Sequence, residues 1–233
     1  MERKISKEKV IMLILVALTA VGITVSGIVW GRDYLKLAPL YVSLSVMLFQ
    51  SEAKRIAPLI GAVNSILYAI VDYSYGLYAS AVSDILFSCT LQFATFILWT
   101  KRKDGSTTIF RKMTVKNRLL ILLAVITVYS VTLIVNLNVG ATLPYLDAYQ
   151  LVGAFATQIL MMFAFLEYTA FSVFGGMITI LLNVFMLGSN PDRAPYLVFS
   201  IYSLICSIRG AYSVSKIYKS QNSKKENSEG EKI

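Results

Sequence analysis

The sequence contains no histidine, only two cysteines and few charged residues: Asp, Glu, Lys and Arg make up 15% of its 233 positions. Soluble domains carry about 25% charged residues, so this composition excludes an ordinary soluble domain. The absence of histidine removes the commonest general base and metal ligand, and with it most familiar catalytic arrangements. Cys89 and Cys206 lie in apolar stretches without metal-ligand spacing, so we expect both to pack in the interior rather than to serve redox or metal chemistry.

Long apolar runs, by contrast, are abundant. Hydrophobic residues are 56% of the chain, and the mean hydropathy is +0.65. A helix of about 20 apolar residues crosses a hydrocarbon core of about 30 Å. We identify eight such stretches, at residues 9–30, 34–51, 56–73, 76–100, 118–137, 146–165, 168–188 and 194–216. The predicted fold class is an all-α integral membrane protein with about eight transmembrane helices, the first of them retained because it lacks an A-x-A cleavage site.

The 22 lysines and arginines give the chain a net charge of +9, and their positions follow the predicted spans. With a cytoplasmic N-terminus, eighteen of them fall in cytoplasmic segments, three fall outside (Arg32, Lys36 and Arg193), and Arg209 lies within the last span. This bias places both termini in the cytoplasm, as the positive-inside rule requires of a multi-pass protein of the cytoplasmic (inner) membrane. Because the basic residues follow the membrane, we do not expect them to bind nucleic acid.

The loop at 101–117 is the longest polar interruption before the tail, and it divides the chain into comparable halves. Each half ends with three predicted spans, which suggests two copies of a three-helix unit in parallel orientation, joined by a linker helix. The predicted organisation is an N-terminal segment with an extra helix at 1–33, a first bundle at 34–103, a loop and linker helix at 104–140, a second bundle at 141–218 and a tail at 219–233. The tail is polar and of low complexity, so we expect it to be disordered.

Polar residues recur inside three predicted spans at the spacing of one helix face. The third span carries Gly61, Asn64, Tyr68 and Asp72; the fourth carries Asp84, Ser88, Gln92, Thr95 and Trp99; the sixth carries Asp147, Gln150, Ala154 and Gln158. An aspartate at the centre of a membrane helix costs about 2.5–3.5 kcal/mol on insertion scales, and an unpaired amide is also costly. These stripes are therefore predicted to face the interior of the bundle.

Two kinds of interior would accept such stripes. Single polar residues in bundles commonly link helices by hydrogen bonds. Three stripes together supply more polar groups than a dry core accommodates, so we favour a water-accessible cavity near the middle of the membrane. Its amides, hydroxyls and rings suit a neutral or cationic solute with an aromatic ring, and its acids, Asp72, Asp84 and Asp147, lie toward the outer ends. The sequence has no glycine-rich phosphate loop, so an ATP-driven pump within this chain is not expected.

Other single residues leave two interpretations open. Trp99 is either an anchor at the membrane interface or a ligand contact. Arg209 either extends to the cytoplasmic surface or pairs with Glu167 inside the bundle. Gly175 and Gly176 form either a notch for close helix packing or the floor of the cavity.

Two segments carry a family resemblance. GAVNSILYAIVDYSYGLYASAVSDIL at 61–86 and LQFATFILWTKRK at 91–103 contain an Asn, a Tyr-Ala pair, a Gly-Leu-Tyr turn and a helix ending in Trp and basic residues. In YLDAYQLVGAFATQILMMFAFLEY at 145–168, Asp-Ala opens one helix and a Glu followed by an aromatic opens the next. Over about residues 34–216 this combined pattern resembles the PnuC family of bacterial vitamin and nucleoside transporters.

The resemblance implies a SWEET-like 3+1+3 fold with two three-helix bundles, a linker helix and a further N-terminal helix. It implies facilitated diffusion of a nucleoside-like vitamin, most often nicotinamide riboside, which a cytoplasmic kinase then traps by phosphorylation, and it points to homo-trimers. We expect no cofactor and no metal. We predict hydrogen-bonding contacts to the substrate from Asn64, Tyr68, Gln92 and Gln158, and stacking contacts from Trp99, Tyr168 and Phe171.

The chain departs from the family pattern of a Glu, two tryptophans three residues apart and an Asn, because these positions read Glu167, Tyr168, Phe171 and Gly175. The missing amide at Gly175 removes a hydrogen bond whose loss costs about 1–3 kcal/mol when the ligand partner is left unpaired. Thiamine, riboflavin and deoxynucleosides therefore remain alternative substrates. A substrate-binding subunit of an ATP-driven importer is a second transport hypothesis, and a membrane sensor or scaffold is the non-transport one. Without histidine or paired acids within a helix, the chain is predicted not to be an enzyme.

Overall fold

A computed structural model describes residues 7–30, 34–74, 84–104, 107–138, 143–188 and 191–230. Its helices are α1 (Lys7–Val29), α2 (Tyr34–Ser51), α3 (Ile56–Ser74), the π-helical turn η1 (Asp84–Cys89) with α5 (Thr90–Lys101), α6 (Val115–Asn138), α7 (Pro144–Met162), α8 (Tyr168–Leu187), the 3-10 turn η2 (Pro191–Arg193) and α9 (Ala194–Gly230). Two-residue strands β1 (Lys103–Asp104) and β2 (Thr107–Thr108) form an antiparallel pair. The predicted roles of residues 75–83 and of the Asp72 side chain lie outside the described residues.

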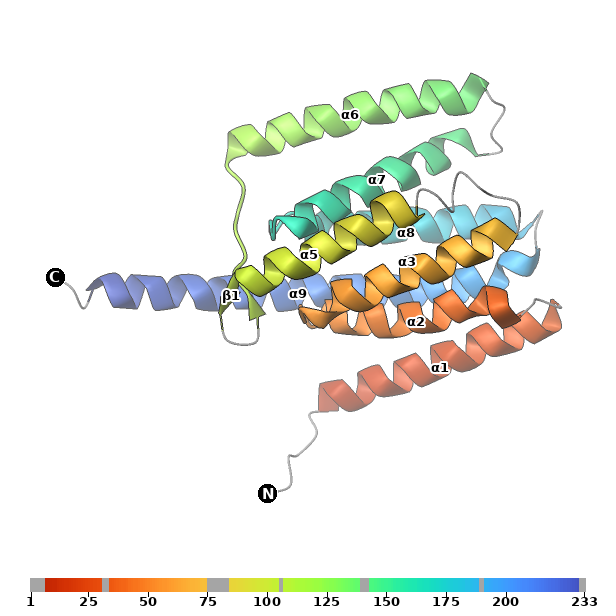
Figure 1. The fold of residues 1–233 in the computed structure, drawn as a ribbon, viewed down its shortest axis with the longest axis horizontal. Helices are drawn as coiled ribbons and strands as arrows, with labels where there is room; N and C mark the ends of the chain where they lie inside the picture. The colour runs from red at the N-terminus through yellow and green to blue at the C-terminus, as the bar shows by residue number, and fades with distance from the viewer. Residues whose placement is uncertain are drawn as a thin grey trace.

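Six helices form a closed ring. Helix α2 packs against α3, α3 against α5, α5 against α7, α7 against α8, α8 against α9, and α9 returns to α2. The remaining two long helices lie outside this ring, α1 against α2 and α9, and α6 against α7 (Figure 1). A ring has an inner face, so polar residues on all six helices can converge without contacting lipid.

The outer surface of the described bundle is apolar. Many large hydrophobic side chains are exposed, among them Leu119, Leu123 and Val131 of α6, a helix without one buried residue in its described length. Within the described residues, α1, α6, α8 and the part of α9 at 194–223 are long and apolar enough to cross a membrane. Exposed apolar area on this scale marks contact with lipid rather than water, which confirms the prediction of an all-helical, multi-pass membrane protein.

One end of the bundle is closed by a hydrophobic cluster. Here α2, α5 and α7 end, α3, α6 and α8 begin, and residues 107–114, which we call the strap, cross from β2 to α6 (Figure 1). The cluster, called the end cluster below, consists of Ala53, Trp99, Phe110, Met113, Leu160, Met161, Ala164, Tyr168 and Val214. It joins residues from both halves of the chain, so this end is tightly packed.

The tail differs from the sequence prediction of disorder, because α9 continues as a helix through residue 219 to Gly230. The side chain of Gln221 holds the first part of this extension. Its Nε2 donates to the carbonyl oxygen of Thr108 (3.0 Å), and its Oε1 accepts from the backbone N–H of Phe110 (3.1 Å). This pair of bonds fastens the extended helix to the strap, a long-range contact that composition does not reveal.

Candidate substrate path

Polar side chains within the ring are joined across helices by hydroxyl groups. On α2, the Oγ of Ser43 accepts a hydrogen bond from Asn64 Nδ2 of α3 (2.7 Å) and lies 3.4 Å from the hydroxyl of Tyr68. Asn64 and Ser43 are only 5% and 7% exposed. The part of the predicted polar face at Asn64 and Tyr68 is therefore turned toward a neighbouring helix rather than toward lipid.

Gln92 of α5 occupies a similar position on the next interface. Its Nε2 donates to Ser65 Oγ of α3 (3.0 Å), and its amide lies directly against Gly61. A Cβ at position 61 would overlap the end of the Gln92 side chain, so glycine allows this close approach and a larger residue would displace the Gln92 amide. The position of the Gln92 amide thus depends on the absence of a side chain at residue 61.

Two buried acceptors lack a hydrogen-bond partner among the described residues. They are Oδ1 of Asn64, on α3, and Oε1 of Gln158, on α7. A buried acceptor without a donor costs about 1–3 kcal/mol, so sites of this kind need an explanation such as water or a ligand. The two acceptors come from different halves of the chain, and both accept from N–H or O–H donors.

Two of the predicted stacking residues lie in the end cluster. Trp99 is fully buried, its Nε1 donates to the carbonyl oxygen of Met161 (2.7 Å), and its ring contacts Phe110 edge-on at 5.7 Å between centroids. Tyr168 is 3% exposed and stacks on Phe110 with 6.4 Å between centroids. Of the two interpretations of Trp99, an interfacial anchor is wrong, because the ring has no exposed surface.

Phe171, the third predicted stacking residue, is partly buried and packs against the end cluster. Together with Leu122 and Tyr129 of α6 and Tyr149 of α7 it lines an apolar groove of about 380 Å³ between α6, α7 and α8. Phe171 lies one turn into α8, and it lines this groove together with residues of α7. Neither Asn64 nor Gln92 lines this groove.

The cavities of the described bundle do not lie among the predicted hydrogen-bonding contacts. In the described part of the chain, a cavity of only about 10 Å³ lies between α2, α8 and α9, lined by Gln50, Ser51, Tyr168, Ser172 and Ser207 among others. This volume holds about one water molecule. Neither this cavity, nor the groove between α6, α7 and α8, nor a groove between α1 and α9 is lined by Asn64, Tyr68, Gln92 or Gln158. The wide central cavity expected from the sequence is therefore not one of these three cavities.

The strap is hydrogen-bonded to the turn between α7 and α8. Arg111 N–H donates to the Ala164 carbonyl (2.9 Å), and Leu166 N–H donates to the Arg111 carbonyl (2.8 Å). With Phe110 and Met113 in the end cluster, these bonds hold the strap across the ends of the helices. Any solute leaving through this end must displace the strap or the cluster.

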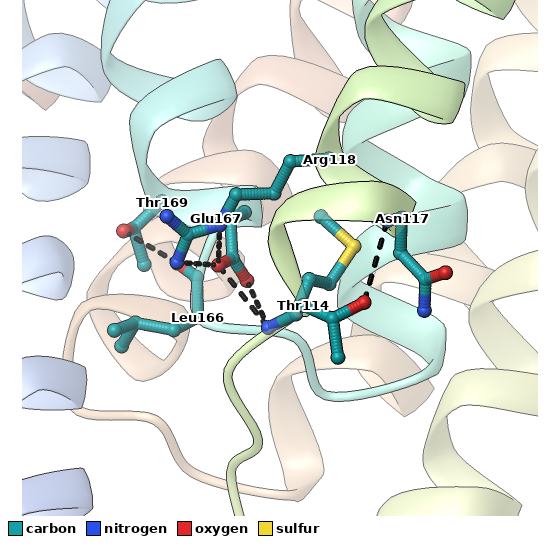
Figure 2. Close-up of polar contacts among 7 residues, drawn as sticks. Thr114, Asn117, Arg118, Leu166, Glu167 and Thr169 are labelled. Carbon is teal, nitrogen blue, oxygen red and sulfur yellow. Dashed lines mark hydrogen bonds and ion pairs between the residues drawn. The ribbon is translucent and has the colours of Figure 1, made fainter.

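Glu167 joins the strap and α6 to the start of α8. Its carboxylate accepts from Arg118 Nε (2.8 Å) and from the backbone N–H of Met113 (3.2 Å), and Arg118 Nη2 lies 2.6 Å from the same oxygen. Figure 2 shows Arg118 extending from α6 to this carboxylate. The predicted alternative of an Arg209–Glu167 pair is wrong, since Glu167 is already paired with Arg118.

Arg209 instead connects α9 to the end of α2. Its Nη1 donates to Ser51 Oγ (3.0 Å) and its Nη2 to Glu52 Oε1 (3.2 Å), while Lys54 also pairs with Glu52. Burial by itself would raise the pKa of Glu52, but the hydrogen bonds and charges of Lys54 and Arg209 outweigh it and hold that pKa below 4.5, its ordinary value. The carboxylate stays charged at neutral pH.

The two adjacent glycines of α8 have different surroundings. A Cβ at Gly176 would lie 3.1 Å from Leu204 of α9, so Gly176 is a close-packing notch. A Cβ at Gly175 would meet nothing within 4 Å. The interpretation as a notch for close helix packing therefore holds for Gly176 alone. Gly175 lines none of the three cavities.

Sequence reasoning missed the serines that receive the amides, Ser43 and Ser65. Ser43 and Gln50 lie seven residues apart on α2 and therefore share a helix face. This stripe resembles those found on the other spans, but serine and glutamine alone in a short apolar run carry a weak signal. Ser65 follows Asn64 directly, so it does not share the helix face of Asn64 and Tyr68 on which the prediction was based.

An apolar exterior and a ring of helices with amides and hydroxyls at their interfaces define a polytopic membrane protein. The chain belongs to the family described as nicotinamide mononucleotide transporter, whose family model matches residues 33–214. This confirms the resemblance to the PnuC family. The matched range leaves out α1 and the end of α9.

Two proteins show the extent of the similarity. The nicotinamide riboside transporter PnuC of Neisseria mucosa is 26% identical over 180 residues, which are 74% of this chain and 68% of the relative. A crystal structure of the vitamin B3 transporter PnuC superposes with a TM-score of 0.75 at 23% identity, covering 93% of this chain and 94% of that one. The structural likeness establishes the shared fold.

Proposed function

We propose that this protein is a uniporter that admits nicotinamide riboside to the cell by facilitated diffusion. The family membership supports transport, and the curated relative supports this substrate. The observation that carries the proposal is the pair of buried acceptors without donors, Asn64 Oδ1 and Gln158 Oε1. A riboside offers them hydroxyl and carboxamide donors.

The ring supports a repeat of two three-helix units. In the first half α3 lies between α2 and α5, and in the second half α8 lies between α7 and α9. The halves meet where the first helix of one packs against the third helix of the other, at α2–α9 and at α5–α7. A two-fold axis along the membrane normal would produce these two seams, as in a SWEET-like 3+1+3 arrangement with α6 as linker and eight spans in all.

The proposed site residues fall into three groups. Asn64, Tyr68, Gln92 and Gln158 would contact the substrate after the halves separate, exchanging the hydrogen bonds to Ser43 and Ser65 for bonds to the solute. Trp99 and Tyr168 would act at the end cluster, as the seal that opens toward the cytoplasm, and Phe171 would act from the α6–α8 groove. The conformation described here is then the one closed at its cytoplasmic end, with both termini in the cytoplasm of a cell whose cytoplasmic membrane holds the protein.

The proposal is tested with the purified chain in vesicles that contain no kinase. Because nothing in the proposal supplies energy, labelled nicotinamide riboside should enter until inside and outside concentrations are equal and then stop. Enclosing a nicotinamide riboside kinase with ATP should convert this plateau into continued accumulation. Accumulation above the outside concentration without a kinase would contradict passive transport.

Substrate choice is tested by ligand-induced thermal stabilisation. A ligand at about 100 times its Kd adds about 2.7 kcal/mol to the stability of the folded state. We expect nicotinamide riboside to raise the melting temperature more than nicotinamide mononucleotide, thiamine, riboflavin or deoxynucleosides. A larger shift with one of these compounds would identify it, rather than nicotinamide riboside, as the substrate. Co-purification with an ATPase subunit would favour the hypothesis of a substrate-binding subunit of an importer. The mass of the detergent-solubilised protein tests the proposed homo-trimer.

A further inference from the structure

A groove of about 430 Å³ separates α1 from α9 at the strap end of the bundle. The buried residues of α1 gather in its second half, with Met12 the exception, and Figure 1 shows its N-terminal end lying away from α9. Apolar side chains, Ile11, Met12 and Ile217, line part of the groove. The two helices therefore diverge and leave a wedge that opens within the membrane thickness.

Cations and hydroxyls line the rest of this groove. Arg209 and Lys216 contribute positive charge, and Tyr212 contributes a phenol that is 71% exposed. Arg209 uses Nη1 and Nη2 for Ser51 and Glu52, but a guanidinium has five N–H donors, so others remain available. The one acid in the lining is Glu8, an exposed residue in the first turn of α1.

We propose that this groove binds an anionic phospholipid of the cytoplasmic leaflet, with its phosphate at Lys216 and Arg209 and its acyl chain along Ile11, Met12 and Ile217. The inference rests on the membrane orientation given under the proposed function. A wedge between membrane helices is filled by lipid, because an empty volume in the bilayer loses the dispersion contacts of its walls. Basic pockets between helices on the cytoplasmic side select anionic headgroups from that lipid.

The side of the groove next to α2 gives the lipid a role in transport. Arg209 is the residue through which α9 contacts Ser51 and Glu52 at the α2–α9 seam. A phosphate bound to Arg209 would compete with Glu52 for the same guanidinium. Occupancy of the groove is thereby coupled to the contact between the two halves.

Native mass spectrometry of the full-length protein measures the binding directly. The protein is released from micelles that contain phosphatidylglycerol or phosphatidylcholine with identical acyl chains, and the fraction with lipid retained is recorded. We expect preferential retention of phosphatidylglycerol, and about fivefold weaker retention in Lys216→Gln, the effect of one basic residue near a charged membrane surface. Lys219→Gln is the matched control, since it removes the same charge from an exposed residue three positions later that does not line the groove.

A second variant tests the apolar part of the site. Ser213 also lines the groove, and Ser213→Trp fills it while leaving both cations in place. Retention of phosphatidylglycerol should fall in this variant as well. Equal retention of the two lipids by the unmodified protein, or equal losses in Lys216→Gln and Lys219→Gln, would overturn the proposal.

Competition with inorganic phosphate distinguishes a lipid-binding site from a site that binds phosphate alone. Millimolar inorganic phosphate should not displace phosphatidylglycerol, because it lacks the acyl chain; displacement would show a phosphate site and refute the lipid assignment. The readout does not involve transport. A protein that retains phosphatidylglycerol but moves no riboside would refute the proposed function alone, whereas normal flux without lipid preference would refute this inference alone.

Discussion

Trp99 Nε1 donates a 2.7 Å hydrogen bond to the carbonyl oxygen of Met161, and this bond joins α5 of the first half to the end of α7 of the second. Arg209, at the other seam between the halves, joins α9 to the residues that end α2. Both seams are therefore fastened by a polar contact at the same end of the bundle. A carrier that opens at this end must break or bend these contacts.

Trp99→Phe should destabilise the protein by about 2 kcal/mol, because it loses a hydrogen bond and part of a buried ring. Thermal unfolding in detergent measures the loss. Phe93→Leu on the same helix is the control, since Phe93 is 49% exposed on the lipid side and should change stability little. If the Trp99 indole packs in the end cluster and does not contact the substrate, nicotinamide riboside should stabilise Trp99→Phe as much as it stabilises the unmodified protein. Loss of that stabilisation with unchanged stability of the free protein would assign Trp99 to the substrate.

Gln158→Leu should raise stability and lower transport. The substitution removes a buried acceptor that has no donor, and such removal gains about 1 kcal/mol. The same change deletes an acceptor that we propose for the substrate, so vesicle uptake should fall at least tenfold. Thr157→Val is the neighbouring control, because its hydroxyl bonds within its own helix to Gly153. Normal uptake by a stabilised Gln158→Leu protein would exclude Gln158 from the site.

Gly61→Ala and Gly175→Ala should have opposite effects. At position 61 the new methyl group collides with the Gln92 amide and breaks its hydrogen bond to Ser65, so both stability and uptake should fall. At position 175 the methyl group enters open space, and replacing a helical glycine should gain about 0.5–1 kcal/mol. Melting temperatures of both variants provide the comparison. Equal effects at the two positions would show that the Gly61–Gln92 contact is unimportant.

Arg118 and Glu167 should be energetically coupled. Because Arg118 is 40% exposed, we expect a coupling of only about 1 kcal/mol in a double-mutant cycle of Arg118→Met and Glu167→Gln. Glu167→Gln keeps an acceptor for the Met113 N–H, so the cycle reports mainly the ion pair. Lys116→Met, an exposed cation on the same helix, should show no coupling to Glu167. A zero coupling for Arg118 would mean that the strap holds α6 without it.

Acid should weaken the α2–α9 seam through Glu52. Its pKa is lower in the folded protein than the ordinary value of 4.5, so its charge stabilises the fold above that value and the contribution is lost as pH falls through the folded pKa. Melting temperatures should therefore show no Glu52-dependent change from pH 7 to about pH 5 and a decline below. Glu52→Gln should be less stable at neutral pH and lack this part of the decline. Parallel pH curves for both proteins would contradict the assignment.

Much of the architecture follows from local patterns in the sequence. Several helices of the structure begin and end within a few residues of the predicted stretches, as α6 at Val115–Asn138 does for 118–137, whereas α9 runs to Gly230, well beyond the predicted end at 216. Asn64 and Gln92 are turned toward neighbouring helices, as their spacing indicates. Helix periodicity and hydropathy are properties of adjacent residues, so they can be read without knowledge of the fold.

The sequence by itself determined that the chain is a bundle of apolar helices, and that the polar residues of the third and fourth predicted spans, such as Asn64 and Gln92, are turned toward neighbouring helices. The same prediction was wrong for most of the sixth span, where Asp147, Gln150 and Ala154 are exposed. Tertiary structure alone decided which partner each polar group takes: Arg209 bonds Glu52 rather than Glu167, Trp99 bonds Met161, and Gln221 holds the strap. These partners lie 62 to 157 positions apart, and only the packing of whole helices brings them within hydrogen-bonding distance.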